Sequence, residues 1–147
     1  MVAQFVLLPA ALAVDIYSRD TIVTAGYVRF LLAGAGVVGL VVGIVFVAGG
    51  VLGLGRNLTA LPHPVDDGRM VQAGLYSVVR HPIYAGVIFG SFGAALLAVS
   101  LAGVIMAALV LIFFDRKSRR EEAWLTEKYA EYAQYRLKVR KLIPFIY

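Results

Sequence analysis

The sequence predicts an all-α integral membrane protein with about four transmembrane helices, a tight helical hairpin and a cytoplasmic amphipathic C-terminal helix. The chain has 147 residues, of which 61% are hydrophobic and only 16% are charged, against about 25% charged residues in typical soluble domains. Three long segments contain no charged residue, and the lysines and arginines gather between and after them. The length is that of one domain, so we expect a single membrane domain over residues 1–147.

The cysteine and histidine content limits the chemistry that this chain can perform. There is no cysteine, and the two histidines are His63 and His81. Disulfides, thiolate metal sites and cysteine nucleophiles are therefore excluded. Two histidines alone do not build a zinc site, so no metal centre is predicted.

The first apolar segment runs from Met1 to Val14. It has no lysine or arginine before it, whereas a cleavable signal peptide normally begins with a positively charged region. We therefore interpret it as a short first membrane helix. Because a span needs about 20 residues, this helix is expected to tilt shallowly, to extend past Asp15 or to be truncated.

The second apolar segment, Phe30 to Gly55, lies between Arg29 and Arg56 and predicts the second membrane helix. A helix of this length measures about 39 Å, which is enough to cross a bilayer with some tilt. Residues 34–39 match the dinucleotide fingerprint G-x-G-x-x-G. That motif requires a preceding strand, which a continuous membrane span does not provide.

Small residues in this second helix are better explained by helix packing. Ala35, Gly39 and Gly43 recur at four-residue spacing, and Gly86 and Gly90 form a similar stripe further along the chain. Stripes of this kind allow two membrane helices to approach closely. We expect the two stripes to face other helices.

A polar, proline-containing loop is predicted over residues 56–82, followed by the third apolar segment, Ile83 to Phe114. One helix over that segment would measure about 48 Å, too long for a hydrocarbon core of about 30 Å. Two helices of about 16 residues each, turning near residues 100–103, fit better.

The distribution of charge favours this hairpin. A hairpin puts the 56–82 loop and the 115–147 tail on the same side of the membrane, and together they hold twelve of the fourteen lysines and arginines. Positive loops remain on the cytoplasmic side, so both termini, the loop and the tail are predicted to be cytoplasmic. We expect a multi-pass protein whose functional site lies on that side.

The tail from Asp115 onward reads as a helix that leaves the membrane and continues along its surface, ending before Pro144. Aromatic and apolar residues recur there mostly at three- and four-residue steps: Trp124, Leu125, Tyr129, Tyr132 and Tyr135. This pattern is typical of an amphipathic interfacial helix. Its cations alternate with glutamates, so we expect anionic headgroups rather than nucleic acid as its partner.

Ionisable residues gather at the ends of the hairpin, in the sequence Arg80-His81-Pro82-Ile83-Tyr84 and in Glu121-Glu122. Pro82 predicts a helix start. Folding the hairpin brings the two groups to one membrane surface. Ionisable groups at a membrane span are costly, so they indicate a functional site.

These motifs resemble the isoprenylcysteine carboxyl methyltransferase family, which is related to the phospholipid methyltransferases. The resemblance covers residues 56–147, the catalytic part, whereas residues 1–55 match only as generic membrane helices. The segments that carry it are 74–76, 80–86, 121–125 and 131–146, including the closing Pro-Phe-Ile.

The resemblance implies an integral membrane methyltransferase that uses S-adenosylmethionine and releases S-adenosylhomocysteine. It implies that a lipid-like or prenylated acceptor enters from the bilayer. The implied cofactor-binding residues are Gly68, Arg69, Met70, Val71, Tyr76, His81, Pro82, Ile83, Tyr84 and Glu121. The candidate catalytic residues are Glu121, Lys117 and Arg80.

The residue expected to bind the substrate carboxylate is Lys117, four positions before Glu121. The family usually has arginine there, and lysine supplies a point charge instead of a bidentate fork. Arg116 or Arg120 is the alternative cation for that role.

Three other functions remain open from the sequence. A phospholipid amine methyltransferase would use the same methyl donor on a different acceptor, with Glu121 or His81 as the base. Some sterol reductases share the short motifs and would bind NADPH instead. A non-catalytic membrane scaffold would bind neither ligand.

Overall fold

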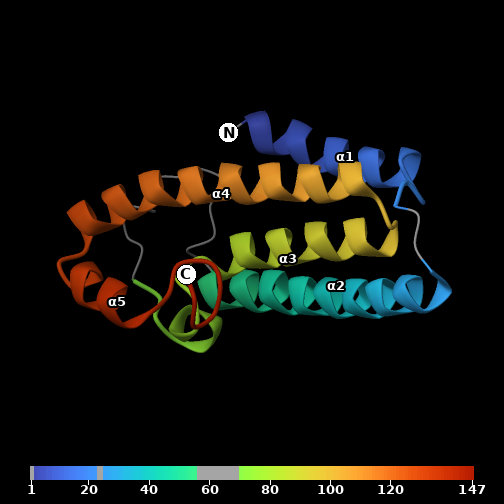
Figure 1. Cartoon of the computed structure of the whole chain (residues 1–147). Helices are drawn as coiled ribbons and strands as arrows, with labels where there is room; N and C mark the ends of the chain where they lie inside the picture. The colour runs from blue at the N-terminus through green and yellow to red at the C-terminus, as the bar shows by residue number, and fades with distance from the viewer. Residues whose placement is uncertain (1, 23–24, 56–69) are drawn as a thin grey trace. The chain divides into compact units, whose positions relative to one another are not determined.

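A computed structural model describes residues 2–22, 25–55 and 70–147 of the chain. The helices are α1 (Val2–Tyr17), α2 (Gly26–Leu54), α3 (Pro82–Leu97), α4 (Leu101–Lys128) and α5 (Tyr132–Lys138), with a short 3-10 helix, η2 (Gly74–Ser77), before α3 (Figure 1). Over the described residues there is no β-strand, and the predicted all-α class is confirmed.

The chain forms two compact units. The first contains Met1–Val45 and Gly86–Phe113, and the second contains Phe46–Ala85 and Phe114–Tyr147. Helices α2, α3 and α4 therefore contribute one segment to each unit.

In the first unit, α2 and α3 approach through glycines. A Cβ atom added to Gly43 would lie 2.7 Å from the carbonyl oxygen of Gly86 and 2.8 Å from the nitrogen of Gly90. A Cβ on Gly36 would lie 2.8 Å from the carbonyl oxygen of Gly93. The packing interpretation is confirmed for Gly39 and Gly43, but Ala35 is exposed and the buried Gly36 takes its place.

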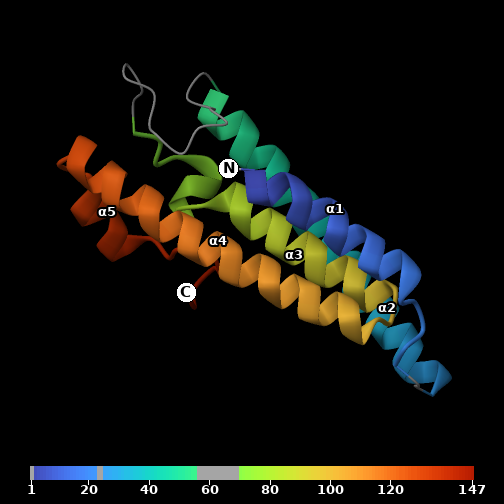
Figure 2. The ribbon, with the colours of Figure 1, turned by 90° about the horizontal axis from the view of Figure 1, so that it is seen from above.

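The predicted hairpin is present, because α3 ends at Leu97 and α4 begins at Leu101 (Figure 2). The turn lies at residues 98–100, slightly before the expected position. Ser100 caps α4, since its Oγ accepts a hydrogen bond from the backbone N–H of Gly103 at 2.9 Å. The segment after α1 closes over the turn, where the N–H of Asp20 donates to the carbonyl of Ala98 at 2.9 Å.

Among the described residues, α2 is the one helix both long and apolar enough to cross a membrane, with a mean hydropathy of 2.7 over its most apolar window. Large apolar side chains on α2 remain exposed, among them Phe30 at 78% and Ile44 at 67%. Such a surface suits lipid better than water. Helices α1 and α3 are apolar but shorter, and α1 extends past Asp15 as expected.

The expected single helix through the tail is wrong. Helix α4 continues to Lys128, the chain then turns, and α5 covers only Tyr132–Lys138. Tyr132 and Tyr135 are 2% and 6% exposed, so neither ring lies at a membrane interface. The hydroxyl of Tyr135 instead donates to the backbone carbonyl of Tyr76 at 2.5 Å, which holds α5 against η2. The three-residue spacing of the tyrosines is therefore a packing signal.

Candidate active site

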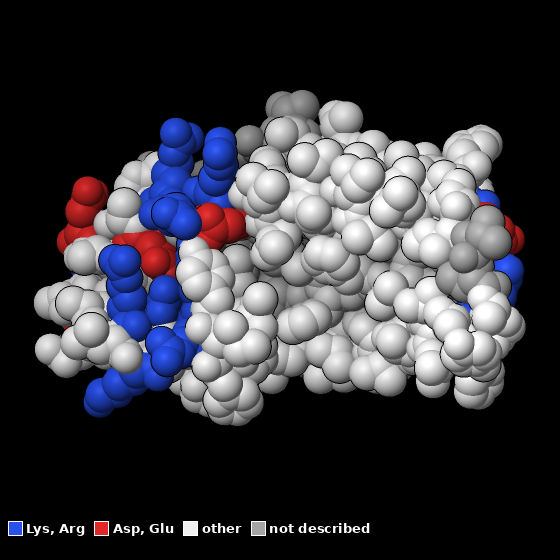
Figure 3. All heavy atoms as spheres, in the orientation of Figure 1, with Lys and Arg blue, Asp and Glu red and all other residues white. Residues whose placement is uncertain are grey.

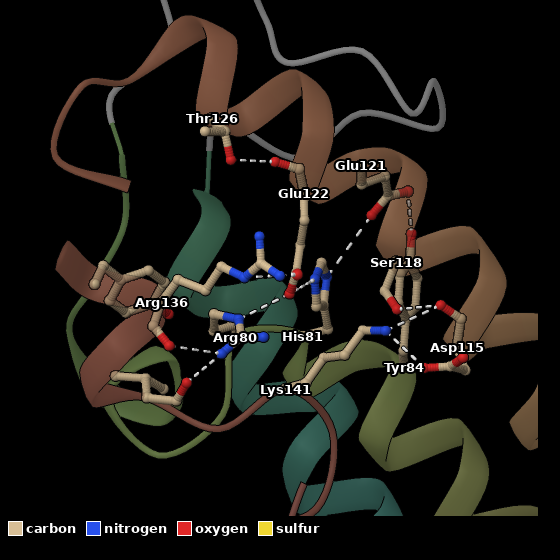
Figure 4. A network of polar contacts seen from close by, with 12 residues as sticks. Arg80, His81, Tyr84, Asp115, Ser118, Glu121, Glu122, Thr126, Arg136 and Lys141 are labelled. Carbon is tan, nitrogen blue, oxygen red and sulfur yellow. Dashed lines mark hydrogen bonds and ion pairs between the residues drawn. The ribbon is translucent and has the colours of Figure 1, made fainter. Parts of the chain in front are cut away.

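The motif at residues 80–84 meets α4 inside the second unit, at the start of α3 (Figure 4). His81 Nε2 lies 3.3 Å from Glu122 Oε1, and His81 Nδ1 lies 3.8 Å from Glu121 Oε2. The side chains of His81, Glu121 and Glu122 are 7%, 15% and 6% exposed, so all three are largely shielded from solvent. The expected proximity of His81 and Glu121 is confirmed.

Glu122 is the centre of a buried ionic network. Its Oε1 accepts a hydrogen bond from Arg80 Nε at 2.7 Å, and its Oε2 lies 3.7 Å from Arg136 Nε. Burial alone would raise the pKa of Glu122, but hydrogen bonds and charges from His81 and Arg80 outweigh it and lower the pKa to about 2. Glu122 is therefore ionised at neutral pH and holds Arg80 and His81 in place.

Arg80 is committed to this network and to the tail. Its Nη1 donates to the carbonyl of Arg136 at 3.2 Å and also to the carbonyl of Val139. Its Nε is bonded to Glu122. These contacts hold the Arg80 guanidinium between α4 and the tail.

Glu121, one position before Glu122 on α4, makes a separate set of contacts. Its Oε1 accepts a hydrogen bond from the Tyr84 hydroxyl at 2.5 Å and lies 3.9 Å from Lys117 Nζ. The Lys117 ammonium lies 4.8 Å from the centre of the Tyr84 ring. The His81 and Tyr84 rings are stacked, with centroids 5.4 Å apart. A carboxylate and an aromatic face thus stabilise a cation at this position.

The helical repeat explains why neighbouring glutamates have different surroundings. Phe114, Ser118 and Glu122 are buried at four-residue spacing, which defines the inner face of α4. Lys117 and Glu121 form the adjacent row and are partly exposed. Sequence reasoning missed Glu122 as a separate group, and the four-residue spacing from Phe114 was the signal that could have found it.

Two of the candidate carboxylate-binding cations lie elsewhere on α4. Arg116 and Arg120 are exposed, whereas the side chain of Lys117 is 17% exposed. Of the three, Lys117 is the one within 4 Å of Glu121.

The tail fixes the backbone of the motif. Val79 and Arg140 form a parallel β-bridge, and the N–H of Arg80 donates to the carbonyl of Arg140 at 2.8 Å. The N–H of His81 donates to the carbonyl of Lys141 at 3.2 Å. The sequence has no periodic pattern that predicts this pairing.

Lys141 then ties the tail to α4. Its Nζ lies 2.6 Å from Asp115 Oδ1 and 3.1 Å from the carbonyl oxygen of the same residue. Burial alone would raise the pKa of Asp115, but hydrogen bonds from Lys141, Tyr147 and Arg119 together lower it below its ordinary value. The motif, the tail and the start of the charged part of α4 form one connected structure.

The remaining cofactor candidates differ in their surroundings. A Cβ on Gly50 of α2 would lie 2.7 Å from Ile83 Cγ1 and 3.3 Å from Pro82 Cγ, so both residues pack closely on α2. The Tyr76 hydroxyl donates to the carbonyl of Gly50 at 3.3 Å. Met70 and Val71 are partly exposed, and Gly68 and Arg69 lie outside the described residues.

Known proteins resemble this chain in sequence. The family model for phospholipid methyltransferases (PEMT) matches residues 31–132. The protein-S-isoprenylcysteine O-methyltransferase of Saccharomyces cerevisiae is 39% identical over 83 residues, which are 55% of this chain and 35% of that protein. A probable protein-S-isoprenylcysteine O-methyltransferase of Oryza sativa subsp. japonica is 30% identical over 115 residues, covering 76% of this chain and 60% of the relative.

A solved structure shares the fold. It is described as the eukaryotic intramembrane Ras methyltransferase ICMT (isoprenylcysteine carboxyl methyltransferase), with a TM-score of 0.71 and 27% identity. The match covers 79% of this chain and 43% of that one. This chain thus spans less than half of the solved protein and 35% of the yeast relative.

Proposed function

Because this chain belongs to the phospholipid methyltransferase family, we propose that it transfers a methyl group from S-adenosylmethionine to a lipophilic acceptor in the membrane. The acceptor that we propose is the carboxylate of an isoprenylcysteine-like molecule, in line with the names of the similar relatives. The observation that carries the proposal is the cluster of Glu121, Tyr84, Lys117 and His81 at the end of the hairpin.

The cluster suits the methyl donor, which carries a positive charge and supplies an electrophilic methyl group when bound. Glu121 and the Tyr84 ring already surround the ammonium of Lys117, so an organic cation is stabilised by the same groups. The Tyr84 hydroxyl fixes the orientation of the Glu121 carboxylate. Buried contacts to Glu122 hold His81, which stacks on Tyr84.

Other candidates contribute to this site through the scaffold. Tyr76, Pro82 and Ile83 pack on the end of α2 and fix the start of α3, from which Tyr84 projects. Burial raises the pKa of Tyr76, with further contributions from Tyr135 and Glu121, so its hydroxyl remains protonated. Arg80 acts as a positioning residue through Glu122.

Lys117 is the proposed contact for the acceptor. A carboxylate is already nucleophilic and needs a cation to hold it in line, so positioning accounts for much of the acceleration. Lys117 Nζ lies only 3.9 Å from Glu121, and the proposed donor and acceptor positions are adjacent.

We further propose that α1, α2, α3 and the apolar part of α4 are four membrane spans, with the site on the cytoplasmic side. Twelve of the fourteen lysines and arginines lie in residues 56–82 and 115–147, which favours this orientation. The short α3 has 16 residues, so it measures about 24 Å and needs a locally thin bilayer or extension by the residues around it.

A phospholipid amine is the alternative acceptor, and the name of the matching family favours it. An amine must lose a proton before it accepts a methyl group, and Glu121 could take that proton. The ammonium of Lys117 beside Glu121 supplies the cation that a carboxylate acceptor needs and that an amine acceptor does not use. This juxtaposition makes the carboxylate the better candidate.

Donor binding is tested first, by calorimetric titration of S-adenosylmethionine, which carries the sulfonium charge, into the detergent-purified chain. Glu121→Ala and His81→Ala are expected to weaken binding at least tenfold, about 1.4 kcal/mol for each tenfold change. Glu127→Ala, an exposed change on the same helix, is the matched control. Unchanged binding in both site variants would refute the site, and binding of NADPH instead would favour a reductase.

The acceptor is identified with labelled donor and two candidates, a farnesylated cysteine derivative and phosphatidylethanolamine. Label lost in mild base indicates a methyl ester, whereas base-stable label indicates an N-methyl group. Lys117→Met should raise the KM for the carboxylate acceptor, and Lys117→Arg should restore it. Incorporation only into phosphatidylethanolamine would overturn the proposed acceptor while leaving donor use intact.

A further inference from the structure

The second unit contains a polar cleft of about 290 Å³ that lies apart from the proposed methyl-transfer site, since Glu121, Tyr84 and Lys117 do not line it. Its lining combines five cations with one carboxylate and two residues of the last turn: Arg80, Arg119, Glu122, Arg136, Arg140, Lys141, Ile146 and Tyr147. Figure 3 shows blue lysine and arginine atoms gathered on this part of the surface. The proposed methyl transfer makes no use of it.

The cleft has an excess of positive charge. Its carboxylate, Glu122, is already bonded to Arg80 and close to His81. The side chains of Arg119 and Arg136 are 67% and 58% exposed, and Arg140 is exposed as well. Guanidinium groups that converge on an open cleft suit a phosphate, which accepts hydrogen bonds from several arginines at once.

The position of the cleft along α4 indicates where that phosphate comes from. Asp115 is the first charged residue after the apolar run, which puts it at the level of the lipid headgroups in a helix that crosses the membrane. Three of the lining residues contact Asp115: Lys141 at 2.6 Å, Tyr147 at 2.8 Å and Arg119 at 2.9 Å. The cleft is therefore fixed to the point where α4 leaves the apolar region.

Exposed apolar side chains border the cations. Ile146, which lines the cleft, is 75% exposed, and its neighbour Phe145 is 89% exposed. The last residues form a closed turn in which the N–H of Leu142 donates to the carbonyl of Tyr147 at 2.7 Å. A fixed turn that presents apolar side chains beside arginines has the character of a surface that contacts both headgroups and acyl chains.

We propose that this cleft binds the phosphate of an anionic phospholipid, with Ile146 and Phe145 in contact with the acyl region. Arg80 is committed to Glu122, and Lys141 and Arg119 are bonded to Asp115. Arg140 is exposed, and Arg136 has only a longer contact of 3.7 Å to Glu122 with a side chain 58% exposed, so these two are the cations most available to the phosphate. The bound lipid is a regulatory or anchoring ligand, separate from the methyl acceptor. The site stands whether or not the proposed methyl transfer is correct.

The test uses the full chain in an uncharged detergent and measures the thermal unfolding midpoint as phosphatidylglycerol is added. This lipid has no amine and no carboxylate, so it cannot act as either proposed methyl acceptor. Phosphatidylcholine with the same acyl chains and inorganic phosphate are the parallel additions. We expect phosphatidylglycerol to raise the midpoint, and neither of the others to match it.

The variant Arg136→Gln/Arg140→Gln should bind phosphatidylglycerol about 30-fold more weakly, since each cation near an anionic lipid contributes about fivefold. Lys128→Gln/Lys138→Gln removes the same charge from exposed positions that do not line the cleft. That control should keep the response. If the double variant unfolds without lipid, Arg140→Gln alone replaces it, with an expected loss of about fivefold.

Three results would overturn the proposal. An equal response to inorganic phosphate would show a general anion site, and an equal response to phosphatidylcholine would show no headgroup preference. An equal loss in the two double variants would show that net charge, rather than this cleft, attracts the lipid.

Discussion

The Nε of Arg80 donates to Oε1 of Glu122 over 2.7 Å, and both side chains are more than nine-tenths buried. Two residues that follow Arg80 contact different glutamates. His81 lies against Glu122, whereas the Tyr84 hydroxyl donates to Glu121. One pair of adjacent glutamates thus serves both a buried scaffold and a partly accessible site.

Glu122→Gln is expected to destabilise the protein by about 3 kcal/mol, because it removes the negative partner of a buried cation. The measurement is the free energy of unfolding in detergent, by denaturant titration. Glu127→Gln, an exposed substitution on the same helix, should change it by less than about 0.5 kcal/mol. Equal effects in the two variants would contradict the buried network.

Stability should fall in acid through the same residue. The folded pKa of Glu122 is lowered from its ordinary 4.5 to about 2, so its contribution is complete above pH 4.5 and is lost as the pH falls towards 2. Asp115, whose pKa is also lowered, should act in the same direction. Thermal midpoints between pH 7 and pH 3 should decline less in Glu122→Gln than in the unmodified chain. Parallel declines would assign the acid sensitivity to other groups.

Tyr84→Phe should leave the fold intact and weaken S-adenosylmethionine binding about three- to tenfold. The hydroxyl that orients Glu121 is lost, and such a hydrogen bond is worth about 0.5–1.5 kcal/mol. Calorimetry measures the affinity, and Tyr27→Phe, at a residue 73% exposed on α2, is the control. Unchanged affinity would mean that the donor does not depend on the orientation of Glu121.

Gly43→Ala should separate α2 from α3 and destabilise the protein by about 1–3 kcal/mol, since the new methyl group would lie 2.7 Å from the carbonyl oxygen of Gly86. Gly34→Ala, on the same helix, meets nothing within 4 Å and should be neutral or slightly stabilising. Thermal unfolding of the two variants decides between close packing and a tolerant interface.

The sequence was sufficient for features that depend on length, charge and local chemistry. The uncharged run after Pro82 is too long for one span, which required the turn and brought His81 near Glu121. Pro82 begins α3, as its missing N–H predicts. These conclusions rest on constraints that a bilayer imposes on any helix.

Features that depend on distant backbone contacts could not be predicted in this way. The pairing of residue 79 with residue 140 is a single β-bridge with no alternating pattern around it. The tyrosines at 132 and 135 have the spacing of an interfacial helix, yet both are buried, and the hydroxyl of Tyr135 donates to the backbone of η2. Neither outcome can be read from a local pattern, because the partner segment decides which face is covered.

The backbone pairing of His81 with Lys141 has a consequence during biosynthesis. Translation runs from the amino end, so His81 leaves the ribosome well before Lys141, whose carbonyl accepts its backbone hydrogen bond. Until then Arg80 lacks its carbonyl partners on the tail, Arg136 and Val139. Competence for the proposed methyl donor should therefore appear late, after residues 136–141 have left the ribosome.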